Sequence, residues 1–124
     1  MTFFVVEVHK GVTVVRRATK NDIAEIVYAL IQLIPLGCVA TYGDVAKVVG
    51  LSPRYIARIL KENRNPIAVP CHRVIKSNGK VGGYTLDGKR ASYFKERLLR
   101  LESLGKPLCR LKDELIRIQG FTDR

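Results

Sequence analysis

The first hydrophobic pattern along the chain is typical of two paired strands. β-branched and aromatic residues dominate residues 3–9 and 12–17. Lys10 and Gly11 separate the two runs, and a glycine can adopt the positive φ angle that a tight turn requires. The pattern therefore predicts a β-hairpin over residues 3–17.

The second pattern begins at Asp22 and has the period of an α-helix. Its apolar residues recur at intervals of three and four positions and form one stripe: Ile23, Ile26, Val27, Leu30, Ile31 and Ile34. Thr19 and Asp22 have the spacing of a capping box, in which each side chain bonds the other residue's backbone N–H. Pro35 and Gly37 follow the stripe, so we expect the helix to end there.

Residues 41–63 predict two short helices joined by a tight turn. Three valines form the inner face of the first helix: Val45, Val48 and Val49. Gly50 can end that helix, Ser52 can cap the next one, and Pro53 suits its first turn.

The second of these helices has an apolar side and a basic side. The apolar side consists of Ile56, Ile59 and Leu60, and the basic side consists of Arg54, Arg58 and Lys61. A charged stripe is usually the solvated face of a helix, but charges of one sign do not form the salt bridges of an ordinary exposed helix. The pattern predicts a helix-turn-helix whose basic side faces a phosphate backbone.

Two further helices are predicted in the last third of the chain, over about residues 92–104 and from about residue 106 to Gly120. Their apolar positions are Phe94, Leu98 and Leu101 in the first and Leu111, Leu115 and Ile118 in the second. The whole pattern predicts one domain over residues 1–124: a hairpin in residues 1–20, a core in residues 21–105 and an extra C-terminal helix in residues 106–124. Its fold class would be mostly α with a small N-terminal β-hairpin, built around a winged-helix-like helix-turn-helix for DNA binding.

The charge of the chain supports a phosphate-rich partner. Lys and Arg number 22 and Asp and Glu number 11, which leaves a formal charge of +11. Such a charge is typical of nucleic-acid binding, although it also keeps a small protein soluble. The apolar segment of residues 26–36 is too short to span a bilayer, and the N-terminus does not have the pattern of a signal peptide. We therefore expect a monomer in the cytoplasm, associated with the nucleoid or located in the nucleus according to the organism.

The cysteines indicate reduced thiols. Cys38, Cys71 and Cys109 form no CxxC pair, and with His9 and His72 they are a poor set of zinc ligands, so we expect no metal site. A Cys38–Cys109 disulfide is possible in principle. An odd number of cysteines in an intracellular chain nevertheless argues first for free thiols.

The segment of residues 69–84, "VPCHRVIKSNGKVGGY", is the best candidate for chemistry. Cys71 and His72 are adjacent, and a thiolate nucleophile needs a base or a positive neighbour. Consecutive side chains on a strand point to opposite faces, so the two would need a turn or a bridging water. A buried Cys beside a satisfied His is the alternative. The glycines at 79, 82 and 83 favour an open loop that another molecule can approach, and hence a reactive pocket.

The strings "VPCHRVI" and "GKVGGY" resemble the active-site signature of the O6-alkylguanine-DNA alkyltransferases, also called methylated-DNA–protein-cysteine methyltransferases. The resemblance covers about residues 34–105. It implies DNA repair by direct damage reversal: the protein binds duplex DNA that contains O6-alkylguanine, turns the damaged base out and transfers the alkyl group irreversibly to a cysteine. It implies no cofactor and no metal.

The resemblance also implies roles for the catalytic residues. Cys71 would be the acceptor, His72 the base that deprotonates it through a water, and Glu102 the carboxylate that orients His72. Asn63 would brace the active-site turn, with Asn65 as the alternative. Tyr42 would protonate the leaving guanine and turn the DNA phosphate. Packing for Tyr42 and a surface pairing with Lys95 for Glu102 are the structural alternatives.

On the DNA side, the resemblance implies that Arg54 fills the stack that the flipped base leaves, although Arg54 could instead be a solvated charge. The loop over the base would comprise Val81, Gly82, Gly83, Tyr84 and Thr85. Arg58, Lys61 and Arg73 complete the expected set of DNA contacts.

The chain departs from the family pattern in three places. Its helix-turn-helix turn is short, its N-terminal region is reduced to a hairpin and one helix, and its segment after Thr85 is longer, where Lys89 and Arg90 could add phosphate contacts or change lesion preference. The family includes alkyltransferase-like proteins in which the acceptor cysteine is replaced. A lesion-binding protein that recruits other repair factors is therefore the alternative function, and a sequence-specific regulator is a more distant one.

Overall fold

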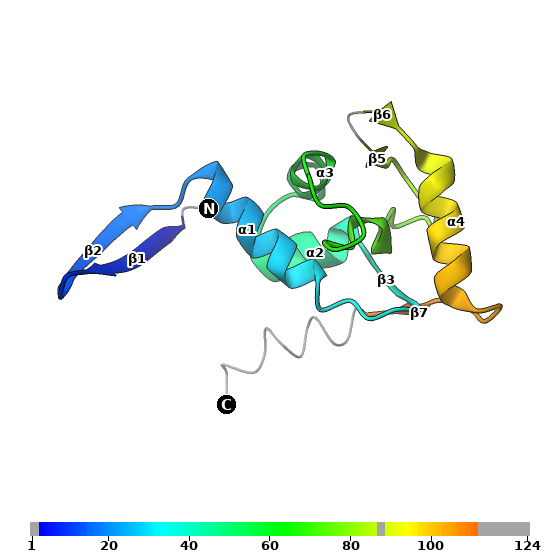
Figure 1. Cartoon of the computed structure of the whole chain (residues 1–124), viewed down its shortest axis with the longest axis horizontal. Helices are drawn as coiled ribbons and strands as arrows, with labels where there is room; N and C mark the ends of the chain where they lie inside the picture. Colours follow the sequence, from blue (N-terminus) through cyan, green and yellow to red (C-terminus); the bar gives the residue numbers. More distant parts are fainter. Residues whose placement is uncertain (1–2, 87–88, 112–124) are drawn as a thin grey trace.

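The computed structural model describes residues 3–86 and 89–111, which form a mixed α/β structure. A β-hairpin lies at one end, three helices lie in the middle, and the fourth helix lies at the other end (Figure 1). A small sheet and two short strands complete the described residues. The prediction of a mostly α fold is therefore correct for the hairpin and helices but leaves out the sheet.

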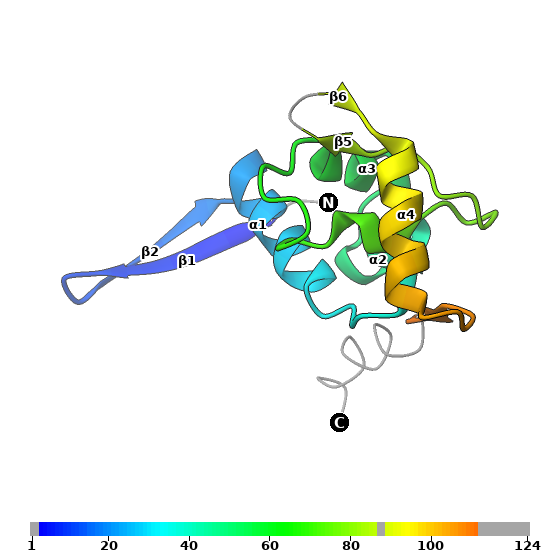
Figure 2. The same ribbon diagram turned by 45° about the vertical axis from the view of Figure 1, so that its right-hand side comes forward.

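The hairpin consists of β1 (Phe4–His9) and β2 (Val12–Arg17), paired antiparallel from Phe4 opposite Arg17 to His9 opposite Val12. This confirms the predicted hairpin. The two strands project away from the helices in both views (Figures 1 and 2). Arg16 anchors the hairpin to the first helix, because its guanidinium donates to Glu7 at 2.9 Å and to Asp22 at 2.7 Å.

Helix α1 (Lys20–Ile31) begins as the sequence predicts. The Thr19 side chain accepts from the Asp22 N–H and the Asp22 carboxylate accepts from the Thr19 N–H, so both halves of the capping box are present. Val27 and Ile31 are completely buried in the core. The Tyr28 hydroxyl donates to the carbonyl of Ile59 at 2.8 Å and fixes α1 against the third helix.

The helix-turn-helix consists of α2 (Tyr42–Val49) and α3 (Pro53–Lys61). A second capping box, between Thr41 and Asp44, starts α2, and Gly50 ends it with a φ of 74°. The Ser52 hydroxyl caps α3, and Pro53 lies in its first turn. These boundaries confirm the predicted pair of helices.

A three-stranded parallel sheet holds the centre of the fold together. Its order is β4 (Val74–Ile75), β3 (Cys38–Thr41) and β7 (Cys109–Arg110), with Ala40 opposite Val74 and Val39 opposite Arg110. Each strand has only two to four residues. Such strands are too short to show a period of two, and their partners lie far away in the sequence, so the hydrophobic pattern did not reveal them.

Cys38 and Cys109 form a disulfide, which corrects the expectation that all three cysteines are reduced. The two residues lie directly opposite each other in the parallel pairing of β3 and β7, with their Cα atoms 4.4 Å apart. That separation allows a disulfide without movement of the backbone. Cys71 is the free cysteine.

Helix α4 (Ser92–Ser103) confirms the predicted helix but buries a different face. Leu101 is 72% exposed, whereas Leu99 and Lys95 are buried. The stripe drawn through Phe94, Leu98 and Leu101 is therefore wrong at its last position. The buried face instead passes through Lys95 and Leu99, which are four residues apart.

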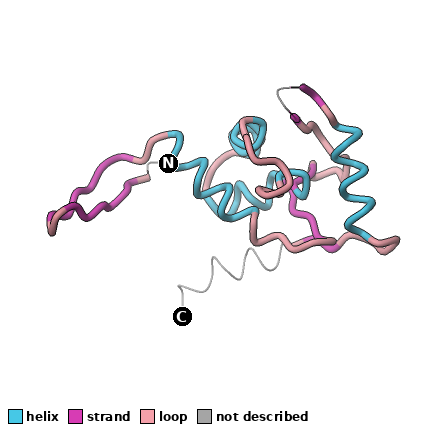
Figure 3. The backbone as a smooth tube through the Cα atoms, viewed as in Figure 1, coloured by secondary structure: helices cyan, strands magenta, loops and turns pink. Residues whose placement is uncertain are grey.

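The predicted C-terminal helix falls mostly outside the described residues, which end at Leu111. In the described part of that segment, β7 occupies Cys109–Arg110 where the prediction places helix. Short strands β5 (Thr85–Leu86) and β6 (Lys89–Arg90) precede α4 and pair antiparallel. Figure 3 shows these strands beside the N-terminal end of α4.

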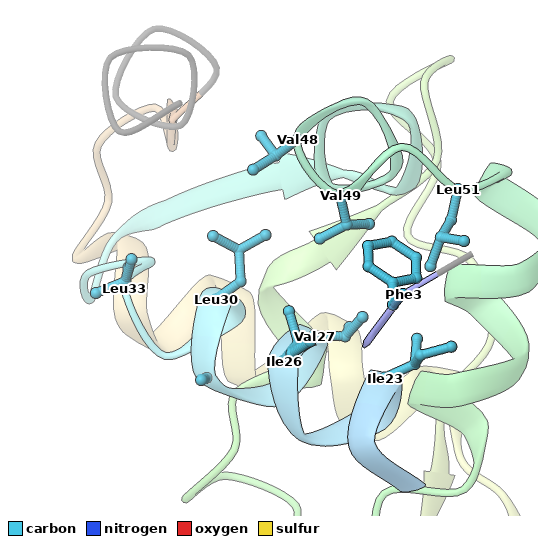
Figure 4. A pocket seen from close by; sticks show the side chains of 10 residues that line it. Phe3, Ile23, Ile26, Val27, Leu30, Leu33, Val48, Val49 and Leu51 are labelled. Atoms are coloured by element: carbon cyan, nitrogen blue, oxygen red, sulfur yellow. The ribbon is translucent and has the colours of Figure 1, made fainter. Parts of the chain in front are cut away.

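An apolar groove lies between α1 and the end of α2 (Figure 4). Its volume is about 570 Å³. The lining side chains are all apolar: Phe3, Ile23, Ile26, Val27, Ala29, Leu30, Leu33, Val48, Val49 and Leu51. Because no side chain in this groove can titrate, act as a nucleophile or bind a charge, the groove has no candidate catalytic residue. No helix in the described ranges has both the length and the apolarity to cross a membrane.

Candidate active site

Cys71 lies at the start of a single turn of 3₁₀ helix, Cys71–Arg73, at the floor of a pocket of about 870 Å³. Pro70 precedes the turn, and its carbonyl accepts from the N–H of Arg73 at 2.9 Å. The turn ends where β4 begins, so the central sheet fixes its position. Cys71 is 7% exposed, and it lines the pocket with its thiol within the core cluster.

Asn63 braces this turn from the end of α3. Its Nδ2 donates to the carbonyl of Val69 at 3.0 Å and to the Cys71 sulfur at 3.2 Å. Its Oδ1 accepts from the backbone N–H of Asn65 at 2.9 Å. Of the two asparagines that the sequence offers, the structure therefore places Asn63 against the thiol, and Asn65 supports Asn63.

His72, Arg73 and Glu102 form a largely buried group that we call the relay cluster, in which His72 is completely enclosed. The Nε2 of His72 lies 2.8 Å from Glu102 Oε2, and since a carboxylate can only accept, this nitrogen carries the proton. Arg73 donates to both oxygens of Glu102, at 2.9 and 3.0 Å, and to the carbonyl of Ile34 at 2.8 Å. These bonds hold Arg73 against Glu102 and Ile34, and the DNA contact that the sequence analysis expects of Arg73 stays a prediction.

The other ring nitrogen of His72 is left available. Nδ1 is buried and makes no hydrogen bond with a described residue, and within the described part of the chain no hydrogen bond joins it to the Cys71 sulfur. The carboxylate of Glu102 therefore selects the tautomer in which Nδ1 can accept a proton.

Burial moves the pKa values of the thiol and the imidazole in opposite directions. It raises the pKa of Cys71, against the smaller lowering by the Asn63 hydrogen bond and the Lys95 charge. It lowers the pKa of His72, against the raising by the Glu102 hydrogen bond. At neutral pH the resting pair is a thiol and a neutral imidazole, so Cys71 needs a base and His72 is in the form that can act as one.

Lys95 is a site residue that the hydrophobic pattern missed. Its side chain is completely buried, and its ammonium donates to the carbonyl of Val74 at 2.6 Å, to the carbonyl of Gly83 at 3.3 Å and to the hydroxyl of Tyr42 at 3.3 Å. Burial lowers the pKa of Lys95 to about 8. The i, i+7 spacing between Lys95 and Glu102 was the available signal, because it places both on one face of a helix.

Lys95 joins Tyr42 to the glycine loop. The ammonium lies 5.5 Å from the centre of the Tyr42 ring, and burial raises the pKa of the Tyr42 hydroxyl, which therefore keeps its proton. Gly82, with a φ of 80°, packs beside the same ring: a Cβ there would lie 3.5 Å from the ring edge and from the hydroxyl. That distance is an ordinary van der Waals contact, so it is the positive φ angle that favours glycine at this position.

The open side of the pocket is cationic. Four basic residues among its lining are exposed and form what we call the basic rim: Arg54, Lys61, Lys76 and Arg90. None of the described residues that line the pocket is acidic. Arg58 lies on α3 outside this lining, so the predicted basic side of α3 contributes two residues to the rim.

The residues of the predicted base-covering loop line two separate hollows. Gly83, Tyr84 and Thr85 line the pocket, whereas Val81 lines a separate hollow with Ile75 and Leu99. Tyr84 is buried, and burial raises its pKa to about 12. No cluster of three His, Cys, Asp or Glu side chains that could hold a metal ion occurs among the described residues.

Known proteins are similar to this chain in sequence and in structure. The sequence profile of the 6-O-methylguanine DNA methyltransferase, DNA binding domain, matches residues 22–104. The chain belongs to this family. The matched residues include the helix-turn-helix, the Cys71 turn and the relay cluster.

The methyltransferase relatives are longer than this chain. It is 42% identical over 79 residues to the methylated-DNA–protein-cysteine methyltransferase of Archaeoglobus fulgidus, a match that covers 60% of this chain and 51% of the relative. The corresponding protein of Methanosarcina mazei is 51% identical over 73 residues, with 56% and 42% covered. The chain thus spans about half the length of the curated relatives it matches.

Solved structures in the family include two complexes with DNA. Mycobacterium tuberculosis OGT in complex with DNA is 32% identical with a TM-score of 0.61, and the match covers 81% of this chain and 58% of that one. Schizosaccharomyces pombe Atl1, solved in complex with damaged DNA containing O6-carboxymethylguanine, is 27% identical with a TM-score of 0.59. That match covers 77% of this chain and 95% of Atl1.

Proposed function

We propose that this chain repairs O6-alkylguanine in duplex DNA by transferring the alkyl group to Cys71. The observation that carries the proposal is the placement of one free thiol at the floor of a cationic pocket, with Asn63 on its sulfur and the relay cluster behind it. Membership of the 6-O-methylguanine DNA methyltransferase family supports the same chemistry.

The reaction is a displacement at the alkyl carbon. The Cys71 sulfur forms a bond to that carbon while the bond from the carbon to guanine O6 breaks, and the electron pair of that bond leaves with the purine. The thiol proton goes to His72, through a water in the route that the family resemblance implies. The purine takes a proton from Tyr42. His72 then loses a proton to water and Tyr42 regains one from water, so the net products are a thioether and an unmodified guanine.

Each member of the relay cluster has a distinct task in this scheme. Glu102 accepts from Nε2 of His72, so Nδ1 is the proton acceptor, and the carboxylate stabilises the imidazolium that forms. Arg73 holds both oxygens of Glu102 and is therefore a positioning residue. Because the cluster is buried, the electrostatic interaction between imidazolium and carboxylate is stronger than it would be in water.

Lys95 and Tyr42 act on the leaving-group side. Lys95 donates to the Tyr42 hydroxyl, and a cationic donor makes that hydroxyl a better proton donor to the purine. The Lys95 charge also lowers the pKa of Cys71 and so favours the thiolate. The same ammonium fixes the Gly83 carbonyl, which holds the loop that closes one side of the pocket.

A base can reach Cys71 only after it has left the stack, because the thiol lies at the floor of a pocket. Arg54 begins the outer side of α3 at the pocket mouth and is the residue proposed to occupy the gap in the duplex. Lys61 and Lys76 would neutralise nearby phosphates. Arg58 is exposed on the same helix and would contribute a weaker, non-local attraction.

Mass spectrometry of the Cys71 peptide tests the proposal. After incubation with a duplex that contains O6-methylguanine, we expect the peptide to gain the mass of one CH₂ group, in an amount equal to the protein consumed. The Cys71→Ala variant is the control and should bind the duplex without modification. An unmodified Cys71 in a wild-type protein that binds the lesion specifically would refute transfer.

Lesion binding without transfer is the second candidate function. It is favoured by the match to Atl1, which covers 95% of that protein, while the matches to the methyltransferases cover about half of each relative. In that case Cys71→Ala would leave both lesion binding and survival of alkylation in cells unchanged. The thiol with its Asn63 contact and its neighbouring base favours transfer over this alternative.

A further inference from the structure

The paired strands β5 and β6 form a ribbon on the side of the pocket that faces α3. In both ribbon views these strands lie beside α3 and lead directly into α4 (Figures 1 and 2). Thr85 and Arg90 of the ribbon line the same pocket as Cys71 and Arg54. The pocket mouth thus has cations from α3 on one side and a cation from the ribbon on the other.

The base of the ribbon is firmly anchored. The N–H of Ala91 donates to the carbonyl of Tyr84 at 2.7 Å, directly below the first ribbon pair. Tyr84 is buried and its ring lies 6.0 Å from that of Phe94 on α4. Lys95, which follows Phe94 in α4, donates from its ammonium to the carbonyl of Gly83. The ribbon therefore starts from the buried core, which holds the position of Arg90 relative to Cys71.

The register of the ribbon separates its two basic residues. Thr85 is paired with Arg90, and directly paired residues of an antiparallel ribbon share a face. Since successive side chains alternate, Lys89 lies on the opposite face. The pocket lining agrees, because it includes Thr85 and Arg90 but not Lys89. Two adjacent exposed cations of equal charge thus have different surroundings.

We propose that Arg90 binds a DNA phosphate on the side of the pocket mouth opposite the cations of α3, and that Lys89 does not. This rests on the proposed function in one respect, namely that duplex DNA occupies the pocket mouth. A guanidinium suits the position because it can donate two parallel hydrogen bonds to phosphate oxygens. With the backbone held from both sides, a nucleotide turned into the pocket would have its flanking phosphates fixed.

The salt dependence of DNA binding tests this proposal, with Lys89→Ala as the matched control. Each phosphate contact contributes about 0.9 to the slope of log K against log salt concentration. For Arg90→Ala on an undamaged duplex we expect the slope to fall by about one, and the affinity at about 0.1 M salt to fall about eightfold. Lys89→Ala should keep the wild-type slope, and Arg90→Lys should recover most of it.

Three results would overturn the proposal. Equal salt slopes for wild type and Arg90→Ala would show that Arg90 does not contact a phosphate. Equal losses of affinity for Arg90→Ala and Lys89→Ala would show that the two residues contribute only through their charge and not through a specific contact. A duplex containing O6-methylguanine, measured in the Cys71→Ala background so that nothing reacts, should show the same loss for Arg90→Ala. A loss confined to the damaged duplex would mean a contact with the base and would also overturn the proposal. Failure of alkyl transfer is detected separately, by the mass of the Cys71 peptide.

Discussion

Charged side chains lie on two sides of Cys71, in the relay cluster and in the basic rim. The two groups differ in their exposure to solvent. In the relay cluster, His72 is completely buried and the Glu102 side chain is only 10% exposed, and both oxygens of Glu102 accept at least one hydrogen bond. In the basic rim, Arg54, Lys61, Lys76 and Arg90 are all exposed.

The difference suits the two tasks that the proposed function requires. Proton transfer requires fixed groups in a medium of low dielectric constant, where each interaction is strong and directional. Capture of a duplex requires charges in water that can adapt to the phosphate backbone, and salt screens them. Substitutions in the relay cluster should therefore lower the rate of alkyl transfer. Substitutions in the basic rim should instead lower the affinity for DNA and the salt dependence of binding.

The largest effect should come from Glu102→Gln. Without the carboxylate, the imidazolium of His72 is no longer stabilised, and the tautomer with a free Nδ1 is no longer enforced. We expect the single-turnover rate of alkyl transfer to fall by about 10²–10⁴, with little change in affinity for the damaged duplex.

Glu96→Gln is the control for that variant. Glu96 lies on the same helix and pairs with Arg100 at the surface, away from the pocket. Two results would contradict the distinction between the relay cluster and the basic rim. One is a comparable loss of rate in Glu96→Gln, and the other is a Glu102→Gln rate that returns to the wild-type value at saturating DNA.

Lys95→Met should change the pH dependence of stability, because Lys95 is a buried charge rather than a rim charge. The folded pKa is about 8 and the unfolded value is 10.5, so within that window the unfolded chain binds the extra proton and stability rises with pH. Relative to Lys95→Met, the free energy of unfolding of the wild type should rise by up to about 3 kcal/mol from pH 8 to pH 10.5.

Urea unfolding of both proteins at several pH values measures this difference. The other lysines and tyrosines titrate in both proteins and cancel in the comparison. Parallel stability curves would mean that the folded protein accommodates the Lys95 charge as well as water does.

Arg54→Ala should have a smaller effect, and on binding. We expect its affinity for a duplex containing O6-methylguanine to fall about tenfold at moderate salt and its salt slope to decrease by about one. Arg58→Ala removes the same charge one helical turn later, outside the pocket lining, and should cost less than half as much in free energy. Equal losses for the two variants would mean that the rim has no local role.

The smallest effect concerns the acid limb of the transfer reaction. Because burial lowers the pKa of His72, the neutral imidazole persists below the pH at which an ordinary histidine is protonated, and the rate should fall only at a midpoint below 6.5. The Glu102 hydrogen bond raises the pKa of His72, so the midpoint should move lower still in Glu102→Gln. Single-turnover rates at saturating DNA across pH 5–8 measure both midpoints, and a midpoint above the ordinary value would contradict the assignment of His72.

Local patterns made the helices predictable. The capping pairs Thr19–Asp22 and Ser52–Pro53 are local, and the structure has them as predicted. The apolar stripe of α1 is confirmed in part: Val27 and Ile31 are buried, but Ile26 is exposed and Ile34 lies beyond the end of the helix. The parallel sheet depends on contacts between β3, β4 and β7, which are distant in sequence. The Cys38–Cys109 disulfide follows from the same pairing and was hidden for the same reason.

The site was predictable where a motif names its residues, and less so elsewhere. Cys71, His72 and Glu102 were placed by resemblance, and the structure brings His72 and Glu102 into contact behind Cys71. Lys95 is different, because a lysine on an amphipathic helix is normally solvated. Its burial depends on acceptors that other elements supply, namely the carbonyls of Val74 and Gly83. Arg73 was expected among the DNA contacts, and its bond to Glu102 was not predictable because the two residues lie 29 positions apart.

The Cys38–Cys109 disulfide gives the chain a topology that its linear sequence conceals. Every residue assigned here to the chemistry or to the basic rim, from Tyr42 to Glu102, lies between these two cysteines. The part of the protein that holds these residues is thus a covalent ring, and the hairpin and α1 precede it in the chain. Tension applied to the two ends of the chain would pass through the disulfide and bypass the ring. A single proteolytic cut between Tyr42 and Glu102 would open the ring without releasing a fragment, and the pocket walls would stay tethered until a reductant separated them.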